Sequence, residues 1–306
     1  MRSPASDSSG SSLSETSSAS RRNTEPGPEI IIEDIESLDD MRIVEDLQKE
    51  VWTLDDRDIT PLTQLVAARH AGGQLIGARD GGTLVGFVYG FVGLERGRTI
   101  HHSHMLAVKP AYRNRDVGYK LKVAQRERVL AQGITRITWT FDPLQSLNAY
   151  FNFCKLGVVS DAYKINFYGP ETSSALHRIG TDRLWVTWVL DSDRVQQRLE
   201  GKSVGHEIDA QAMPLIVADA EGWPRELAWK EALAGAQAFI EIPSDINSVQ
   251  RQDAEQATRW REVTRRAFTE AFAAGFHVAD FFRQSRGGQS VGVYGLSQGP
   301  TREDLR

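Results

Sequence analysis

The first half of the chain alternates between short apolar runs and stretches with one apolar face, which predicts strands and helices in turn. Ile30 to Ile32 form a β-branched run, and after it the apolar residues of 38–51 recur at the spacing of one helix face. Ser37 and Asp40, at the start of that stretch, have the character of a capping box. The chain is therefore expected to open with a strand and a helix.

The same pattern continues to about residue 190. A helix is expected over 62–70, and strands over 74–79 and 83–93 flank Asp80-Gly81-Gly82, a hairpin signal. The remaining elements are strand, helix, strand, helix, strand and strand, expected at 102–108, 119–132, 134–141, 146–156, 158–168 and 184–190. The predicted order is β-α-α-β-β-β-α-β-α-β-β, and it predicts an α/β domain over residues 29–192.

A small C-terminal unit is expected over 236–298, after a connecting segment at 193–235. Its elements are a strand, a long helix and two strands, expected at 238–242, 257–272, 277–282 and 290–295. A β-α-β-β unit of this size has little core of its own. We expect it to pack on the first domain or on another copy of the chain.

The two ends of the chain are expected to be tails, at 1–28 and 299–306. Ten of the first twenty residues are serine and almost none is apolar, a composition typical of disorder. An organelle transit peptide is the alternative for an opening rich in serine and arginine, and Asp7 and Glu15 argue against it. No secretory signal is recognisable, so we expect a cytoplasmic protein.

Composition excludes several classes of function. A formal charge of −5 over 306 residues argues against a nucleic-acid partner, because nonspecific binding needs a basic face. The longest apolar stretch, Leu84 to Leu94, contains three glycines and is too short for a bilayer span. Cys154 is the single cysteine, which excludes an internal disulfide, and we interpret it as a packing residue rather than an acyl carrier.

The segment from His101 to Gly118 has the layout of a phosphate-binding turn. A strand runs into a short basic loop and a helix starts at once. Unpaired backbone N–H groups and the positive end of the helix dipole then meet at one place, so an anion is expected there. The alternative is an ordinary strand-to-helix turn with surface arginines.

This segment resembles motif A of the GNAT superfamily of N-acetyltransferases, in which Arg/Gln-x-x-Gly-x-Gly/Ala cradles the pyrophosphate of acetyl-CoA. The resemblance implies the GNAT fold, a mixed, splayed central sheet flanked by helices, with acetyl-CoA or another acyl-CoA as cosubstrate. It implies that the backbone of Leu106, Ala107 and Val108 pairs with pantetheine. It also implies that the pyrophosphate lies against Arg113, Asn114, Arg115, Asp116, Val117, Gly118 and Tyr119.

Asp116 departs from the family pattern, because it takes the place of the middle glycine. A carboxylate about 4 Å from a phosphate charge costs a few kcal/mol at an effective dielectric constant of ~20, unless Arg113, Arg115 or Lys120 screens it. Aspartate tolerates left-handed backbone angles, so the turn itself can form. We expect weakened coenzyme A binding and an intact fold.

His102 and His104 are two residues apart, so they are expected on the same side of their strand. The run from His102 to Val108 resembles the His-x-His-x-Leu-Ala-Val of the arylalkylamine N-acetyltransferases, in which two histidines deprotonate the amine. On that resemblance His102 and His104 are the catalytic bases. A packing role and a metal site are the alternatives, although no third ligand is evident and no metal is expected.

The proton donor for the leaving thiolate is harder to assign. Many family members carry a tyrosine before a Lys-Leu-Gly ending, and Phe153 takes that position here. Tyr150, about one helical turn away, and water are the alternatives. Asn148 and Asn152 are expected to hydrogen-bond the cofactor.

Substrate contacts are expected near the ends of two strands. Asp142 either holds a substrate amine or caps the following helix, and Arg183 is a candidate for holding a carboxylate. Several stretches resemble a bacterial group of predicted acetyltransferases with the same extra C-terminal unit, some of which are thought to acylate amino acids with acetyl or succinyl donors. On that resemblance Arg261 and Arg265 grip a carboxylate, and the alternative is a solvated helix face.

The sequence therefore predicts an acyl-CoA-dependent N-acyltransferase that acts on a small-molecule amine by direct attack. The alternative is a catalytically silent acyl-CoA sensor or scaffold, suggested by Asp116 and Phe153. A homo-oligomer is among the assemblies that the sequence allows. The acceptor amine, the acyl length and the role of the C-terminal unit do not follow from the sequence.

Overall fold

The computed structural model describes residues 29–169, 178–202, 212–286 and 288–299. The tail expected at 1–28 lies outside the described residues, as does all but the first residue of the tail expected at 299–306. The first half carries the predicted order of strands and helices. Its elements are β1 (Ile31–Asp34), α1 (Leu38–Trp52), α2 (Leu62–His70), β2 (Gln74–Asp80), β3 (Thr83–Glu95), β4 (Arg98–Val108), the 3-10 turn η1 (Pro110–Tyr112), α3 (Val117–Ala131), β5 (Arg136–Phe141), α4 (Ser146–Ala149), the π-helix η2 (Tyr150–Leu156), β6 (Val159–Lys164) and β7 (Arg183–Val189).

Local sequence signals account for several of these elements. The Ser37 hydroxyl accepts a hydrogen bond from the Asp40 N–H at 3.0 Å and caps α1, as predicted. Gly81 and Gly82 have φ angles of 53° and 93° in the turn between β2 and β3, where glycine adopts positive φ at little cost. The helix predicted over 146–156 is one turn of α-helix that continues as the π-helix η2.

The second half contains the predicted strand, long helix and two strands, together with further elements. They are α5 (Asp193–Leu199), β8 (Met213–Ala218), β9 (Pro224–Glu226), α6 (Trp229–Ala234), β10 (Gln237–Pro243), α7 (Ile246–Gln252), α8 (Ala254–Ala273), β11 (Phe276–Arg286) and β12 (Gln289–Gln298). The segment expected as a connection, 193–235, thus carries α5, β8, β9 and α6. The C-terminal unit accordingly comprises β8 to β12 with α6, α7 and α8.

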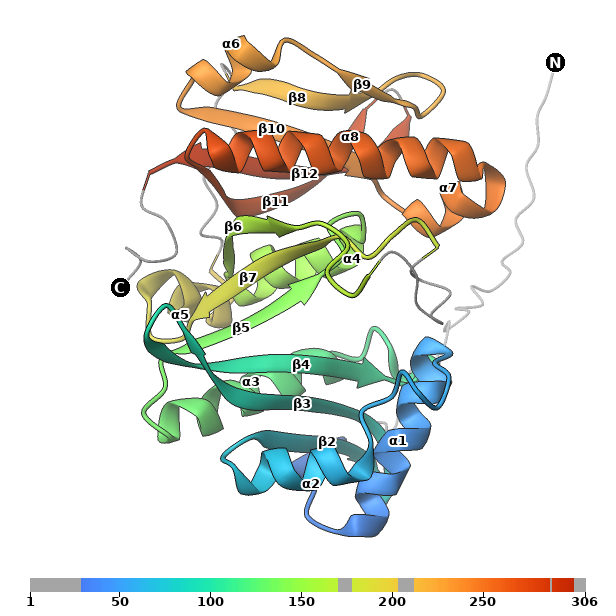
Figure 1. Cartoon of the computed structure of the whole chain (residues 1–306), viewed down its shortest axis with the longest axis vertical. Coiled ribbons are helices and arrows are strands. Elements are labelled where there is room, and N and C mark those ends of the chain that lie inside the picture. The colour runs from blue at the N-terminus through green and yellow to red at the C-terminus, as the bar shows by residue number, and fades with distance from the viewer. Residues whose placement is uncertain (1–28, 170–177, 203–211, 287, 300–306) are drawn as a thin grey trace, which may run out of the picture.

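All the strands of the described residues belong to one 12-stranded mixed sheet, in the order β1-β2-β3-β4-β5-β7-β6-β11-β12-β10-β8-β9. Figure 1 shows them as one stack, with β2 near one end and β9 near the other. The two halves meet where β11 pairs antiparallel with β6, and Val278 lies opposite Ser160. The C-terminal unit therefore packs on the first domain of its own chain, one of the two expected arrangements.

Helices cover both faces of the sheet. On one face, α1 and α2 pack on β2 and β3, and on the other face α3 packs on the same strands. A third core runs across the junction of the two halves, since it includes Phe153 of η2, Trp260 of α8 and Tyr294 of β12. Within the described residues, no helix is long and apolar enough to cross a membrane.

Candidate acyl-coenzyme A and acceptor site

The sheet opens between β4 and β5. Among the described residues, their parallel pairing is confined to His101 with Ile137 and His102 with Thr138. Beyond that point β4 continues to Val108 while pairing on its other side with β3, up to Gly86 opposite Val108. The edge of β4 that faces β5 is thus left without a neighbouring strand along Leu106, Ala107 and Val108, and a ligand with amide groups can pair with such an edge.

The turn between β4 and α3 presents backbone donors at the mouth of this opening. Asn114 and Asp116 have φ angles of 63° and 53°, in the left-handed region that Asn and Asp tolerate. The side chain of Asp116, the N-cap residue of α3, makes no capping hydrogen bond within the described structure. The first N–H groups of α3, from Val117 on, therefore remain free of that side chain and face outward at the positive end of the helix dipole.

The Asp116 carboxylate turns instead toward η2. Its Oδ1 accepts a hydrogen bond from Lys155 Nζ at 2.8 Å, in an exposed ion pair. Screening was expected from Arg113, Arg115 or Lys120, so that expectation missed the partner, which is distant in sequence. Arg113 and Arg115 are exposed beside the same turn. A pyrophosphate at this place would therefore meet backbone donors, two exposed arginines and a carboxylate already paired with a lysine.

The space beside Gly118 shows whether a ligand could approach the turn closely. A Cβ atom added to Gly118 would lie 3.7 Å from Leu106 and 3.9 Å from Val108, which are ordinary contact distances. The protein itself therefore has room for alanine here, and the glycine leaves that space open beside the free edge of β4. The donors, the arginines and this space together fit an acyl-CoA.

His102 and His104 lie together on the face of the sheet that carries α1 and α2. Tyr89 lies opposite Met105 and Gly90 opposite Ser103, so His104 is the extra residue of a β-bulge in β4. The two imidazole rings are 6.4 Å apart. The prediction that both lie on one side is confirmed, and the bulge is a feature that the strand pattern did not show.

Aromatic side chains surround the two histidines. Phe91 lies 5.5 Å from His102 and 6.0 Å from His104, between ring centres. Trp185 of β7 stacks on His102, with ring centres 5.0 Å apart and planes at 29°. Thr138 Oγ1 lies 3.0 Å from His102 Nδ1, so His102 is fixed from β5 as well as from β7.

Burial lowers the pKa of His102 to about 4, and the neighbouring His104 and Lys122 contribute to this lowering. Burial also lowers the pKa of His104, which is nevertheless an exposed side chain. Both imidazoles are therefore neutral at pH 7 and able to accept a proton. A neutral acceptor beside the opening is what deprotonation of an amine requires.

The opposite face of β4 carries a different polar group. Lys122 of α3 is 2% exposed, donates hydrogen bonds to Ser103 Oγ and Gln125 Oε1, and lies 3.9 Å from the ring centre of Trp139. His101, fully buried, lies 3.3 Å from Gln125 through its Nε2. Lys122 forms no ion pair among the described residues, and burial lowers its pKa well below the ordinary value. Nothing in the sequence indicated that Lys122 would be buried, because lysine is ordinarily a surface residue.

The candidate residues of α4 and η2 differ in how far they are exposed. Asn148 is exposed, whereas Asn152 and Phe153 are buried. Phe153 packs edge-on against Phe141 and Tyr294, which makes it a core residue. The thiol of Cys154 donates to the carbonyl of Phe281 at 2.8 Å, and burial raises the pKa of this thiol to about 11. A protonated thiol held in this way agrees with the packing role predicted for Cys154.

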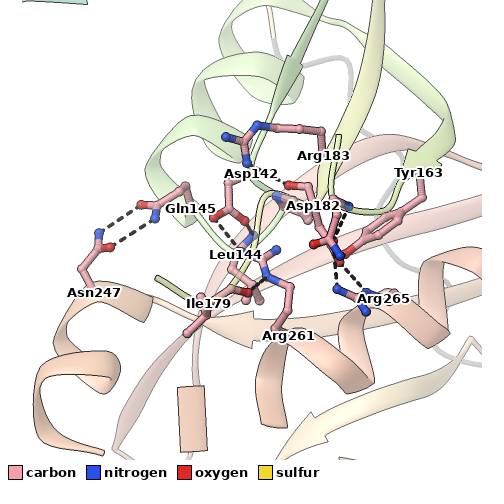
Figure 2. A network of polar contacts seen from close by, with 12 residues as sticks. Asp142, Leu144, Gln145, Tyr163, Ile179, Asp182, Arg183, Asn247, Arg261 and Arg265 are labelled. Carbon is pink, nitrogen blue, oxygen red and sulfur yellow. Dashed lines mark hydrogen bonds and ion pairs between the residues drawn. The ribbon is translucent and has the colours of Figure 1, made fainter. Parts of the chain in front are cut away.

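Asp142 and Arg183 lie in the polar network that Figure 2 shows. Asp142, 9% exposed, accepts from the Leu144 N–H through Oδ1 and from Arg261 Nη2 through Oδ2, at 2.9 and 2.7 Å. Arg183, 6% exposed, donates to the Asp182 carbonyl and lies over the ring of Tyr168. The N-cap residue of α4 is Gln145, so the prediction that Asp142 caps this helix is wrong. Its contacts are those of a turn and an ion pair, and binding of a substrate amine stays a prediction.

Arg261 and Arg265 are not on a solvated helix face, so that alternative is wrong. Arg261 is 2% exposed, and Arg265 makes a two-pronged pair with Asp182, at 2.8 and 3.0 Å. Both arginines grip carboxylates, and these carboxylates belong to the first domain of the same chain (Figure 2). Sequence reasoning identified the arginine pair and missed its partners.

Three further residues of the site escaped sequence reasoning: Thr138, Trp185 and Asp182. Thr138 and Trp185 sit in the middle of apolar strands and touch His102 from 36 or more residues away in sequence. Asp182 precedes β7 and is fully buried. An acidic residue just before a predicted strand was the one signal that the sequence offered for Asp182. In the part of the chain that the structure describes, no group of three or more His, Cys, Asp or Glu could hold a metal ion.

Comparison with known proteins gives a family for the first domain. Residues 35–154 match the family model described as "Acetyltransferase (GNAT) family". No curated protein matches the chain in sequence.

Solved structures with a similar arrangement include three acetyltransferases. The ribosomal-protein-S18-alanine N-acetyltransferase from Escherichia coli is 13% identical, with 53% of this chain and 94% of that chain covered and a TM-score of 0.42. An aminoglycoside 6'-acetyltransferase type Ii is 20% identical (52% and 97% covered, TM-score 0.42). An acetyltransferase of the GNAT family from Streptococcus pneumoniae is 15% identical (52% and 98% covered, TM-score 0.42). Each covers about half of this chain.

Proposed function

Because residues 35–154 match the model of the GNAT acetyltransferase family, a family of acetyl-CoA-dependent N-acetyltransferases, we propose that this chain acylates the amine of a small molecule. The donor is acetyl-CoA or a larger acyl-CoA such as succinyl-CoA. The acceptor is a small amine such as an amino acid, and the amine attacks the donor directly.

One observation carries the proposal. The pairing of β4 with β5 stops after two residue positions, and the N-terminus of α3 follows at the end of β4. The free edge of Leu106, Ala107 and Val108 offers backbone partners for pantetheine, and the turn from Arg113 to Tyr119 offers donors for the pyrophosphate. A bound acyl-CoA supplies the thioester carbonyl that the amine attacks.

The two histidines supply the base in this proposal. His104 is exposed, so it can reach an incoming amine and pass its proton to water. His102 is fixed by Thr138 and Trp185, and a pKa of about 4 leaves its imidazole neutral at pH 7 but a weaker base than an ordinary histidine. The proposal uses either ring as the proton acceptor, His104 by access and His102 by position.

The proton for the leaving thiolate has fewer candidates. Phe153 is a core side chain and cannot donate one. The ring of Tyr150 is half-buried beneath the guanidinium of Arg283, 4.3 Å from its centre. We assign this step to Tyr150 or to water. Asn148 and Asn152, on the same helical segment, remain proposed cofactor contacts.

For the acceptor, we propose that a carboxylate-bearing amine uses Arg183. Its guanidinium lies over Tyr168, which is 42% exposed and next to Phe167. Phe167 in turn contacts Trp185, the residue that stacks on His102. A positive side chain and the candidate base thus border one continuous aromatic surface.

The experiment is thiol release from acetyl-CoA and succinyl-CoA with a panel of amines and amino acids, alongside a thermal shift with each donor alone. An acyltransferase releases thiol only with an accepted amine, and donor binding raises its melting temperature. If the donors bind and no amine releases thiol, the chain is an acyl-CoA sensor or scaffold. If saturating acyl-CoA leaves the melting temperature unchanged, the proposed function fails.

A further inference from the structure

His102 is held by two strands, and both strands are held in turn by one helix of the C-terminal unit. The contacts of His102 are Thr138 Oγ1 on β5 and the stacked ring of Trp185 on β7. These two strands pair antiparallel, with Phe141 opposite Leu184 and Thr138 opposite Thr187. Asp142 directly follows β5, and Asp182 directly precedes β7. Two carboxylates therefore mark the same end of the pair of strands.

Helix α8 supplies the partners of both carboxylates. Arg261 binds Asp142 at 2.7 Å, and Arg265 binds both oxygens of Asp182. The arginines are four residues apart, so they project from one face of α8. Figure 2 shows them side by side, each directed at its own carboxylate. Asn247 of α7 adds a third link, through paired amide hydrogen bonds to Gln145 at 3.1 and 3.3 Å.

Asp182 connects this anchor to the aromatic residues beside His102. Its carboxylate accepts from the Asn166 N–H at 2.9 Å and from the Tyr163 hydroxyl at 2.8 Å, in addition to Arg265. Asn166 precedes Phe167, which contacts Trp185 at 6.2 Å between ring centres. One buried carboxylate thus fixes the start of β7 and the segment whose aromatic ring packs on Trp185.

We propose that Arg265, with Arg261 beside it, is a positioning residue of the acyltransfer site, so that the C-terminal unit is part of that site. The chain of contacts runs from Arg265 to Asp182 and from Asp182 to the backbone of Asn166. It continues from the adjacent Phe167 to Trp185, and from Trp185 to His102. The proposal rests on the proposed function and identifies the contacts that position His102, its candidate base. Without Arg265, the buried Asp182 loses its direct ion pair and keeps only the hydrogen bonds from Tyr163 and Asn166 and the more distant charge of Arg261, so the start of β7 is expected to shift toward solvent.

The variant that tests this is Arg265→Ala, because the Arg265 side chain is one-third exposed and its removal leaves no large cavity. We expect kcat/KM for the amine to fall by about tenfold or more, since small displacements of catalytic groups are costly. We expect KM for acetyl-CoA to change by less than about twofold, because the proposed donor contacts lie on β4 and α3. Arg265→Lys keeps a positive donor and should recover part of the loss.

Arg259→Ala is the matched control. Arg259 is on the same helix and pairs with Glu226 at 2.9 Å, inside the C-terminal unit. The proposal expects wild-type kinetics from this variant. Equal losses in the Arg259 and Arg265 variants, or a lower melting temperature with unchanged kcat/KM in Arg265→Ala, would mean that α8 is mere packing and would overturn the proposal.

A readout independent of activity is the proton resonance of the His102 ring, assigned by its absence in His102→Gln. The stacked indole of Trp185 shifts this resonance upfield, and we expect it to move downfield in Arg265→Ala and to stay in place in Arg259→Ala. An unmoved His102 resonance in Arg265→Ala sinks the positioning proposal. If wild-type protein releases no thiol with any amine, the proposed function has failed, and this resonance still decides whether α8 positions His102.

Discussion

The two faces of strand β4 both carry histidines, but the histidine on one face is buried, whereas one of the two on the other face is exposed. Toward α3, His101 and Ser103 are buried in a network with Lys122 and Gln125. Toward α1, His104 is exposed, and the neighbouring His102 lies among aromatic rings. Because strand residues alternate between faces, one residue step separates a histidine that no substrate can reach from one beside the opening.

Accessibility, and not residue type or a lowered pKa, thus separates the candidate base from the structural histidine. Burial lowers the pKa of His101 to about 3 and that of His102 to about 4. Both are therefore neutral at pH 7, yet His101 is closed in on both sides. A Cβ on Gly90 would lie 2.6 Å from the His102 carbonyl and would also clash with the His101 ring, so β3 packs directly against this part of β4.

Replacing histidine by glutamine on each face of β4 should give the largest difference in activity. The double variant His102→Gln plus His104→Gln should lose about 10² to 10⁴ in kcat/KM for the amine, the usual worth of general-base catalysis. His101→Gln should keep the activity of the folded fraction and lower the free energy of unfolding, because it disturbs a packed core. Steady-state thiol release and urea unfolding measure the two effects.

Two results would contradict this distinction between the faces. A double variant with wild-type kcat/KM would assign His102 and His104 to packing, the alternative that sequence reasoning left open. A His101 variant that is stable but inactive would move the chemistry to the α3 face.

Sequence patterns predicted the first half of the fold well, because its signals are local. The cap at Ser37 and the hairpin at Gly81 and Gly82 act within a few residues, and each was found where expected. The β-α-β-β order of the C-terminal unit was predicted as well. The strand β9 was missed because three residues are too few positions to show alternation. The strand β8 was missed although 213–218 is an apolar run, because the segment 193–235 was interpreted as a connection.

The contacts that assemble the site were beyond sequence reasoning for a different reason. Arg261 and Asp142 are 119 residues apart, and Lys155 and Asp116 are 39 apart. A charge pattern on one helix cannot show which distant carboxylate it meets. The burial of Lys122 could not be predicted for the same reason. Lysine is almost never fully buried, and only the contact between Lys122 and Trp139, which lie on different elements of the fold, shows that this one is.

Acid should destabilise the protein through its buried histidines. In the folded chain the pKa of His101 is about 3, whereas in the unfolded chain it is near 6.5. Between these values the unfolded chain binds a proton that the folded chain does not, so the free energy of unfolding falls as pH falls below 6.5. The expected slope is about 1.4 kcal/mol per pH unit for each such histidine.

Urea unfolding at several pH values between 7.5 and 4.5 measures this slope. His101→Gln should reduce it, and His104→Gln should change it less, because His104 is exposed in the folded protein. Equal slopes in the wild type and in His101→Gln would show that His101 does not contribute to the loss of stability in acid.

Lys122→Met should stabilise the α3 face by on the order of 1 kcal/mol at pH 7, because burying an ammonium group without a carboxylate is costly. Ser103 and Gln125 remain hydrogen-bonded to one another at 2.9 Å, and the Met sulfur meets Trp139. Since burial lowers the pKa of Lys122, wild-type stability should also rise from pH 7 toward pH 9, and this rise should vanish in the variant. A less stable Lys122→Met protein would contradict this account of the network.

A still smaller effect is expected at the turn that follows β4. Asp116→Gly and Asp116→Asn each remove a negative charge from the proposed pyrophosphate site and release Lys155 from its ion pair. Because both partners are exposed, the gain should stay below about 1 kcal/mol, which is less than a roughly fivefold tighter acetyl-CoA affinity by calorimetry.

Comparing the two Asp116 variants separates charge from backbone shape. Asparagine keeps the tolerance for φ near 53° and removes the charge alone, whereas glycine also frees the backbone. If charge is the cause, both variants tighten binding equally and the gain shrinks as salt is added, because exposed charges are screened. Unchanged affinity in both would show that the Lys155 pair already cancels the carboxylate, and weaker affinity in both would mean that Asp116 supports the cradle rather than opposing its ligand.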